Sequence, residues 1–254
     1  MEDSVAETKL QSRTSDEQRE ARKDLLRLFQ NTPIPPEQQL TNLGLYMRST
    51  ILAKILYLNE LYTLIKERPG IIMEFGVWWG QNLALFESFR GVYEPYNYMR
   101  KVVGVDTFAG YSVPHKEDGT HELVAQGQYS VTNNYDQYLS EVLQYHENEN
   151  VMYQVRKFEL LKGDAPVVTE EYLKRHPETI VALAYFDMQL YEPTKRCLEL
   201  LKPHLVKGSV LAMDELYSWE FPGETIAFKE VLGLDRYQMY RSQFLPDRTY
   251  VIID

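Results

Sequence analysis

The spacing of apolar positions changes partway along the chain and divides it into two patterns. In the first part, the capping-box spacing of Ser15 and Gln18 opens a polar helix, and a broad apolar helix then covers residues 46–67. Beyond it, short apolar runs typical of strands alternate with amphipathic helices. We therefore expect a helical extension over residues 1–68, acting as a lid or an oligomer interface, and one α/β domain over residues 69–254.

Five predicted strands in the second part each precede a helix, and two further strands follow near the C-terminus. The predicted strands cover residues 71–75, 101–106, 158–162, 180–187, 209–214, 238–242 and 249–253. The predicted helices cover residues 82–89, 135–146, 169–175, 194–202 and 224–231. This alternation predicts a mostly parallel sheet covered on both faces, and the short connection at 244–247 predicts an antiparallel hairpin. The expected fold is therefore Rossmann-like α/β, with a seven-stranded, mostly parallel sheet that ends in this hairpin.

The turn after the first predicted strand is the first place to look for a ligand, because such folds bind ligands beyond the carboxyl ends of their strands. It reads Glu-Phe-Gly-Val-Trp-Trp-Gly over residues 74–80. Its glycines let the backbone approach a ligand closely, and the following helix offers free amides. An acid near the first glycine would repel a pyrophosphate but suits the ammonium and sulfonium of S-adenosylmethionine (SAM). A tight turn that holds no ligand is the alternative.

The next two strand exits each carry an acid beside a glycine. Asp106 could accept hydrogen bonds from ribose hydroxyls, and Asp164 from an adenine amino group. A chance arrangement of solvated loop acids is the alternative. The predicted SAM-binding residues are Glu74, Gly76, Val77, Trp78, Gly80, Asn82, Asp106, Thr107, Phe108, Gly163, Asp164, Ala165 and Asp187.

Three further carboxylates follow the fourth and fifth predicted strands. Asp187 ends the fourth strand, and Asp214 and Glu215 end the fifth. Both exits open on the same edge of a parallel sheet, so these groups can converge, and they would repel one another without a cation or a proton. Oxygen ligands suit Mg²⁺, Ca²⁺ or Mn²⁺, and such a metal could lower the pKa of a substrate hydroxyl. A capping Asp, a solvated Glu or a pair that shares a proton are the alternatives.

A loop between the second strand and the next helix carries other candidate groups. His115 and His121 have the pKa range of a general base, although solvated loop histidines are more common. Tyr111, Tyr129 and Trp219 could stack on a sugar or an aromatic ring, or could pack in the core or at its rim.

Composition narrows the choice of partners and compartment. The net charge of −10 gives no basis for binding a nucleic-acid backbone or an anionic membrane. The single cysteine, Cys197, rules out a disulfide framework within the chain and favours the reducing cytoplasm. The polar start shows no signal peptide, and no apolar run reaches the length of a membrane span. We expect a cytoplasmic protein without nucleic-acid or membrane partners.

In combination, these motifs resemble the macrocin O-methyltransferase family. The similarity extends over residues 45–232 and rests on Glu-Phe-Gly-Val-Trp (74–78), Asp-Thr-Phe-Ala-Gly (106–110), Asp-Met-Gln-Leu-Tyr-Glu-Pro-Thr (187–194) and Asp-Glu (214–215). Enzymes of this family methylate sugar hydroxyls of macrolides and related glycosides. The resemblance implies SAM at Glu74, Gly76, Asp106, Gly163 and Asp164, Mg²⁺ at Asp187, Asp214 and Glu215, and a second role for Asp187 as the base.

The chain departs from the family pattern at three places. Gln189 and Glu215 stand where the family usually has aspartates, and Trp-Gly-Gln (79–81) stands where it has Arg-Gly-Gly. Glutamate keeps the charge but adds a methylene, which would alter the geometry of metal ligation. The chain therefore resembles a divergent branch of the family.

The leading hypothesis is a Mg²⁺-assisted, SAM-dependent O-methyltransferase that acts on a sugar, a sugar nucleotide or a related glycoside, with Asp187 or His115 in the catalytic role. A metal-independent small-molecule methyltransferase and a SAM-binding scaffold without catalysis are the alternatives. A nucleotide-binding oxidoreductase is disfavoured, since the first turn lacks the G-x-G-x-x-G pattern. Helices ahead of such a core also suggest a homo-oligomer.

Overall fold

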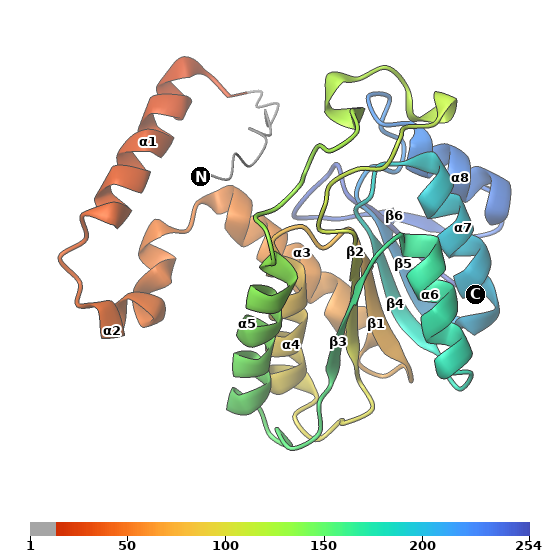
Figure 1. Ribbon diagram of the computed structural model, residues 1–254, viewed down its shortest axis with the longest axis horizontal. Helices are drawn as coiled ribbons and strands as arrows, with labels where there is room; N and C mark the ends of the chain where they lie inside the picture. Colours follow the sequence, from red (N-terminus) through yellow and green to blue (C-terminus); the bar gives the residue numbers. More distant parts are fainter. Residues whose placement is uncertain (1–13) are drawn as a thin grey trace.

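The computed structural model describes residues 14–254. The expectation of no signal peptide concerns segment 1–13, which lies outside the described residues. Three N-terminal elements form an arm that extends away from the sheet (Figure 1): α1 (Asp16–Gln30), α2 (Pro36–Gln39) and the 3-10 helix η1 (Leu40–Tyr46). The Ser15 hydroxyl accepts a hydrogen bond from the Gln18 amide, which confirms the predicted capping box. No residue of these three described elements is buried.

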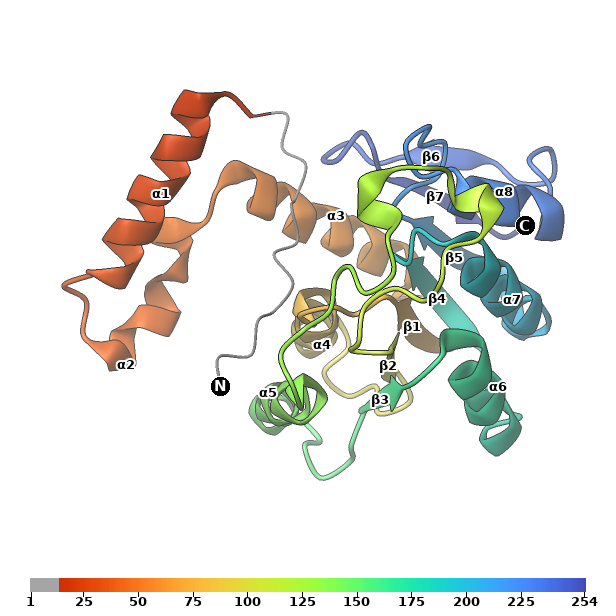
Figure 2. The same ribbon diagram turned by 45° about the horizontal axis from the view of Figure 1, so that its top comes forward.

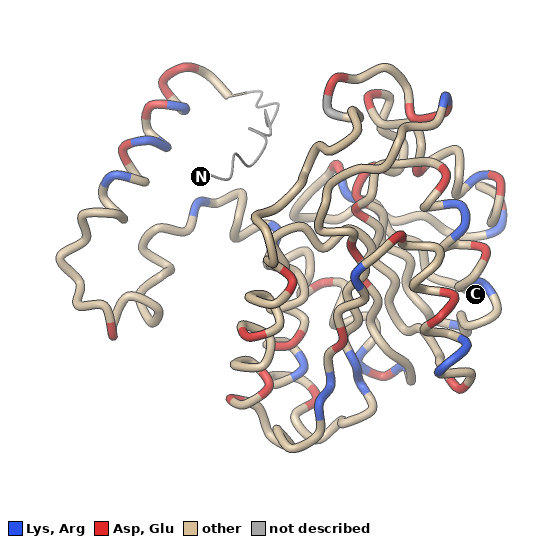
Figure 3. The backbone as a smooth tube through the Cα atoms, in the orientation of Figure 1, with Lys and Arg blue, Asp and Glu red and all other residues tan. Residues whose placement is uncertain are grey.

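Charged residues of opposite sign alternate along α1 (Figure 3). They form ion pairs three residues apart, between Arg19 and Asp16, Lys23 and Glu20, and Arg27 and Asp24. Exposed pairs of this kind stabilise a helix by only a few tenths of a kcal/mol each. The arm therefore depends on local interactions, and its leucines remain open to solvent.

Helix α3 (Ser49–Ile65) joins the arm to the sheet. It begins at Ser49 rather than at the predicted residue 46, because residues 40–46 form η1. The second half of α3 packs against β4 and β5, and its buried residues are Tyr57, Leu58, Leu61, Tyr62 and Ile65. The division of the chain at residue 68 stays a prediction, although this half of α3 belongs to the core.

One seven-stranded sheet forms the centre of the protein, in the order β3-β2-β1-β4-β5-β7-β6 (Figure 2). Its strands are β1 (Ile71–Phe75), β2 (Val102–Asp106), β3 (Phe158–Lys162), β4 (Val181–Phe186), β5 (Leu205–Met213), β6 (Met239–Arg241) and β7 (Thr249–Ile252). The first five strands run parallel, while β7 is antiparallel to both β5 and β6. The predicted Rossmann-like fold and its C-terminal hairpin are thereby confirmed.

Helices cover both faces of the sheet (Figure 2). One face carries α3, α4 (Gln81–Tyr93) and α5 (Tyr135–Glu149), and the other carries α6 (Ala165–Arg175), α7 (Tyr191–Leu201) and α8 (Gly223–Val231). Short 3-10 helices lie at η2 (Lys116–Asp118), η3 (Glu122–Val124) and η4 (Lys202–His204). Alternation along β1 sends Ile72 into one core cluster and Met73 into the other. Among the described residues, no helix has the length and apolar character needed to span a bilayer.

Strand β5 differs most from the prediction, because it begins at Leu205 instead of residue 209. Its register against β4 shifts between the pairs Val181–Leu205 and Leu183–Val210, which marks a bulge. Gly208 lies within it with φ 91°, a conformation that favours glycine. The apolar pattern alone did not predict that the strand continues through this glycine to Leu205.

The strand order reverses between β1 and β4, and this switch point determines where a ligand can bind. The two strands end side by side, and the rings of Phe75 and Phe186 stack with centroids 4.7 Å apart. Residues that follow either strand therefore meet at the same edge of the sheet.

Candidate active site

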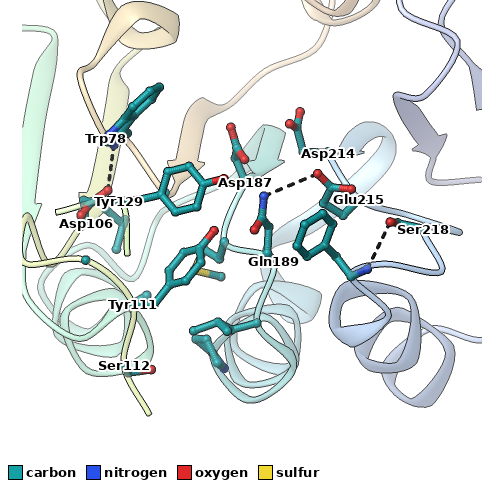
Figure 4. Close-up of a pocket in the computed structure, with 18 of the residues that line it drawn as sticks. Trp78, Asp106, Tyr111, Ser112, Tyr129, Asp187, Gln189, Asp214, Glu215 and Ser218 are labelled. Carbon is teal, nitrogen blue, oxygen red and sulfur yellow. Dashed lines mark hydrogen bonds between the residues drawn. The ribbon is translucent and has the colours of Figure 1, made fainter. Parts of the chain in front are cut away.

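A cavity of about 710 Å³ opens at the carboxyl ends of the parallel strands, beside the switch point (Figure 4). This volume lies within the range of roughly 300–1,000 Å³ that is typical of small-molecule sites. The predicted SAM-binding residues that line it are Gly76, Trp78, Asp106, Thr107, Gly163, Asp164, Ala165 and Asp187. The predicted residues outside this lining are Glu74, Val77, Gly80, Asn82 and Phe108.

The turn between β1 and α4 requires glycine at two positions. A Cβ atom on Gly76 would lie 2.1 Å from the backbone oxygen of Asp187, and one on Gly80 would lie 2.3 Å from a methyl carbon of Leu139. Both glycines have positive φ, and so does Trp78, at 49°. The spacing of the two glycines thus reflects close packing of the turn against β4 and α5.

Glu74 lies behind this turn and is buried. Its Oε1 atom accepts a hydrogen bond from the Asn82 side-chain amide at 2.7 Å, while its Oε2 atom is buried without a partner in the described structure. Burial raises the pKa of Glu74 well above its usual value, and the charge of Lys54 opposes this shift. An unpaired carboxylate oxygen at this place suits a cationic neighbour.

Asp106 has a structural role that the sequence did not indicate. Its Oδ2 atom accepts the amides of Val77 at 2.7 Å and Trp78 at 2.8 Å, and its Oδ1 atom accepts the amide of Phe108 at 2.6 Å. The carboxylate therefore clamps the β1–α4 turn against the end of β2. Oδ1 keeps one lone pair, so a hydrogen bond from a ribose hydroxyl remains compatible with the clamp. Asp164, at the N-cap of α6, forms no side-chain capping bond and is exposed.

The structure brings Asp187, Asp214 and Glu215 into the wall of the same cavity (Figure 4). Burial and the charge of Asp214 raise the pKa of Asp187 to about 7. Burial also raises the pKa of Glu215 to about 7. The two shifts have a common cause, since these carboxylates are crowded together away from bulk water.

Asp214 already has strong partners. Its Oδ1 atom accepts a hydrogen bond from the Tyr185 hydroxyl at 2.5 Å, and its Oδ2 atom pairs with Nη2 of Arg248 at 2.8 Å. Nη1 of Arg248 donates to the backbone oxygen of Asp214 at 3.1 Å. Arg248 lies near the start of β7, and no sequence motif connected it with the strand exits.

The donor set fits Mg²⁺ in chemistry and charge. It consists of carboxylate oxygens, which Mg²⁺ prefers, and the buried amide oxygen of Gln189 has no partner in the described structure. The arrangement is nevertheless not that of a ready metal centre, because no three acidic, histidine or cysteine groups of the described residues are close enough to hold an ion. Ligation by Asp214 would require its contacts with Arg248 and Tyr185 to change.

Glu224 holds the two acidic strand exits in place. Its Oε1 atom accepts the amides of Met188 at 3.2 Å and Gln189 at 3.0 Å, and its Oε2 atom accepts the amide of Glu215 at 3.1 Å. The side chain is fully buried, and burial raises its pKa well above the usual value. The position of Glu224 in the first turn of α8 gave no sequence signal for these contacts with distant strand exits.

His115 does not join the carboxylates. It lines a second cavity, of about 400 Å³, where it caps η2 and its ring stacks on Tyr191 with centroids 5.0 Å apart. The ring of His121 packs against Phe221, with centroids 4.9 Å apart. Neither histidine is among the described residues that line the 710 Å³ cavity, so the predicted catalytic residue His115 lies apart from the acidic cluster.

Aromatic side chains form the rest of the cavity wall. Trp78 packs edge-on against Tyr129, which in turn contacts Tyr111 (Figure 4). Trp219 stands at the rim and is 82% exposed. Its indole ring is therefore accessible to a ligand that enters the cavity, and an aromatic ring offers a face for stacking.

The chain is similar to one family of methyltransferases and to several solved structures. The family model described as Macrocin-O-methyltransferase (TylF) matches residues 54–235. A crystal structure of CalS11, a calicheamicin methyltransferase, is 40% identical and superposes with a TM-score of 0.92, covering 95% of this chain and 94% of that one. Apo CalS11, described as a TDP-rhamnose 3′-O-methyltransferase, is 39% identical with a TM-score of 0.84, covering 95% and 96%.

The O-methyltransferase NovP is more distant, at 19% identity and a TM-score of 0.56, covering 77% of this chain and 78% of that one, and supports the fold alone. A comparison with curated proteins found no match. The family match spans more than half of the chain and includes the strand exits described above. The chain is therefore a SAM-dependent methyltransferase that belongs to the macrocin O-methyltransferase family.

Proposed function

We propose that the protein transfers the methyl group of SAM to a hydroxyl of a sugar, carried by a nucleotide or in a glycoside. The observation that carries this proposal is the convergence of Asp187, Asp214 and Glu215 in the cavity that also receives the turn at 74–80. CalS11, which is similar over nearly the whole chain, is described as a TDP-rhamnose 3′-O-methyltransferase. The acidic groups suit the activation of a hydroxyl, which is a weak nucleophile until it loses its proton.

In this proposal Asp187 acts as the base. Its backbone oxygen lies against Gly76, and Asp187 lines the same cavity as Gly76, Asp214 and Glu215. In the proposed reaction the oxygen of the acceptor hydroxyl attacks the methyl carbon of SAM. The Asp187 carboxylate takes the proton that this hydroxyl loses. The carbon–sulfur bond breaks in the same step and leaves S-adenosylhomocysteine. Tyr111 and Tyr129 would help to exclude water from this point.

Mg²⁺ is the metal proposed for this cluster, with Asp187, Asp214 and Glu215 as ligands. When bound, it would supply a positive charge that lowers the pKa of the acceptor hydroxyl. A second candidate function is metal-independent methylation, and the contact of Arg248 with Asp214 favours it, because the guanidinium already supplies a cation beside the cluster.

Removal of divalent cations tests the metal directly. We expect EDTA to lower turnover at least about tenfold and added Mg²⁺ to restore it, because the cluster would lose its Lewis acid. Turnover is measured by S-adenosylhomocysteine release from a TDP-sugar acceptor, with Mg²⁺-saturated EDTA as the control. Full activity in EDTA would contradict the proposal that Mg²⁺ takes part. The guanidinium of Arg248 would then supply the positive charge beside Asp214.

Substitution of Trp219 tests whether the acceptor stacks on this ring at the rim of the cavity. We expect Trp219→Ala to raise the KM for a sugar-nucleotide acceptor about tenfold, because ring stacking contributes about 1–3 kcal/mol, and to leave the Kd for SAM unchanged. Trp219→Phe should retain most of the affinity. Tyr96→Ala is the matched control, since Tyr96 is 75% exposed and lies outside the lining of the cavity. An unchanged KM in Trp219→Ala would exclude stacking.

We also propose that the protein is a homo-oligomer in which the arm packs on a second copy. The arm exposes Leu26, Leu28, Leu40 and Leu45, each more than half accessible to solvent. Light scattering of the full chain should give a multiple of its 29.9 kDa mass, and Leu26→Ser with Leu28→Ser should reduce that multiple. A monomeric mass for the unaltered chain at micromolar concentration would contradict the proposal.

A further inference from the structure

Two basic side chains, Lys54 and Arg248, are found among the described residues that line the 710 Å³ cavity. The acidic residues of the same wall are more numerous: Asp106, Asp164, Asp187, Asp214, Glu215, Glu220 and Asp247. A ligand that carries a negative charge would be repelled by this wall unless a cation lay beside it. The two basic residues therefore decide where an anionic group can bind.

Arg248 is already engaged, since its guanidinium pairs with the carboxylates of Asp214 and Asp247. The ammonium of Lys54 differs, because it forms no hydrogen bond or ion pair within residues 14–254. Lys54 comes from α3, in a stretch where the sequence predicted only an apolar helix. Its charge acts on Glu74, which lies near the end of β1, and on Asp187, which directly follows the neighbouring strand β4. A cation is thus kept unpaired at the junction of the methyl-donor turn and the acidic cluster.

The methionine end of SAM carries three charged groups: an ammonium, a sulfonium and a carboxylate. The first two suit the acids around the turn, and Glu74 has an unpaired buried oxygen there. The carboxylate does not suit them, because a wall of carboxyl groups offers it no cation. We propose that Lys54 binds the carboxylate of the methionine moiety of SAM. This inference rests on the proposed placement of SAM at residues 74–80.

The assignment gives α3 a part in binding the methyl donor. The same helix packs its second half on β4 and β5, so Lys54 is presented by a helix that is anchored in the core. Because the helix is already ordered, a charge-assisted hydrogen bond from Lys54 costs little conformational entropy beyond that of the lysine side chain. Lys54 would therefore be a binding residue, separate from the groups that act on the acceptor.

Calorimetry with two methyl donors tests the proposal. SAM has the carboxylate, and decarboxylated SAM lacks it but keeps the ammonium, the sulfonium and the adenosine. We expect Lys54→Met to raise the Kd for SAM about tenfold or more, as expected for loss of a charge-assisted bond. The Kd for decarboxylated SAM should stay the same or fall. Lys54→Arg should bind SAM almost normally.

Lys66→Met is the matched control, because Lys66 follows the same helix, is exposed and lies outside the cavity lining. Equal weakening of both donors in Lys54→Met would show a structural role and overturn the proposal. An unchanged Kd for SAM with a raised KM for a TDP-sugar would assign Lys54 to an acceptor phosphate and also overturn it. Failure of the unaltered protein to bind SAM would instead reject the placement of SAM. Thermal melting of each variant confirms that it is folded.

Discussion

Asp187→Asn is expected to lower kcat about 10³-fold, within the range of roughly 10²–10⁴ that general acid–base catalysis contributes. Asparagine keeps the size and planarity of the side chain but cannot take a proton from the acceptor hydroxyl. The backbone contact of residue 187 with Gly76 does not involve the side chain and should survive. The turn at 74–80 should therefore keep its shape, and the Kd for SAM should change by less than about threefold.

Single-turnover measurements with a TDP-sugar, alongside calorimetry with SAM, separate these two effects. Asp247→Asn is the matched control, because Asp247 lines the same cavity but its side chain is 70% exposed and belongs to neither proposed role. Substantial turnover in Asp187→Asn would move the base to another residue. A large loss of SAM affinity together with kcat would instead show that Asp187 mainly holds the methyl donor.

Arg248→Met is expected to lower the free energy of unfolding by about 3 kcal/mol, because removing one partner of a buried ion pair leaves the other charge uncompensated. The side chains of Arg248 and Asp214 are 23% and 6% exposed, so solvent screens this pair little. Urea denaturation measures the change. Arg241→Met is the control from the same hairpin, and with an exposed side chain it should cost less than about 0.5 kcal/mol.

A double-mutant cycle with Asp214→Asn identifies the partner of Arg248. If the two charges stabilise each other, Arg248→Met combined with Asp214→Asn should be more stable than the sum of the single losses predicts, by about 2 kcal/mol. Additive losses would show that Arg248 stabilises the protein through other contacts, such as its bond to the Asp214 backbone. The cycle also bears on the metal, since a released Asp214 would be free to bind Mg²⁺.

Much of the site could be predicted because parallel strands place their carboxyl ends at one edge of a sheet. Asp187, Asp214 and Glu215 follow apolar runs, and recognising those runs as parallel strands was enough to predict that they lie at one edge of the sheet, where they line one cavity. The Gly76–Gly80 spacing likewise marked the turn correctly, because glycine is required where backbones approach closely. These are local signals, carried by a few neighbouring residues.

Contacts between distant segments could not be predicted in this way. Arg248 reaches Asp214 because β7 inserts beside β5, and no pattern near residue 248 indicates this pairing. His115 has the chemistry of a base, yet its capping bond and its stacking on Tyr191 hold it in another cavity. Chemical type alone was therefore a poor guide where a loop determines the position of the side chain.

The sequence by itself determined how strands and helices alternate along the chain, where the glycine turn lies and which acids follow the strands. Each of these depends on the spacing of neighbouring residues. The tertiary structure decided which of those acids are free. It engaged Asp106 with three backbone amides and Asp214 with Arg248, and it left the ammonium of Lys54 in the cavity without a hydrogen bond or ion pair to any of residues 14–254. The physical reason is that the charge balance of a buried site depends on groups that only folding brings within a few ångströms.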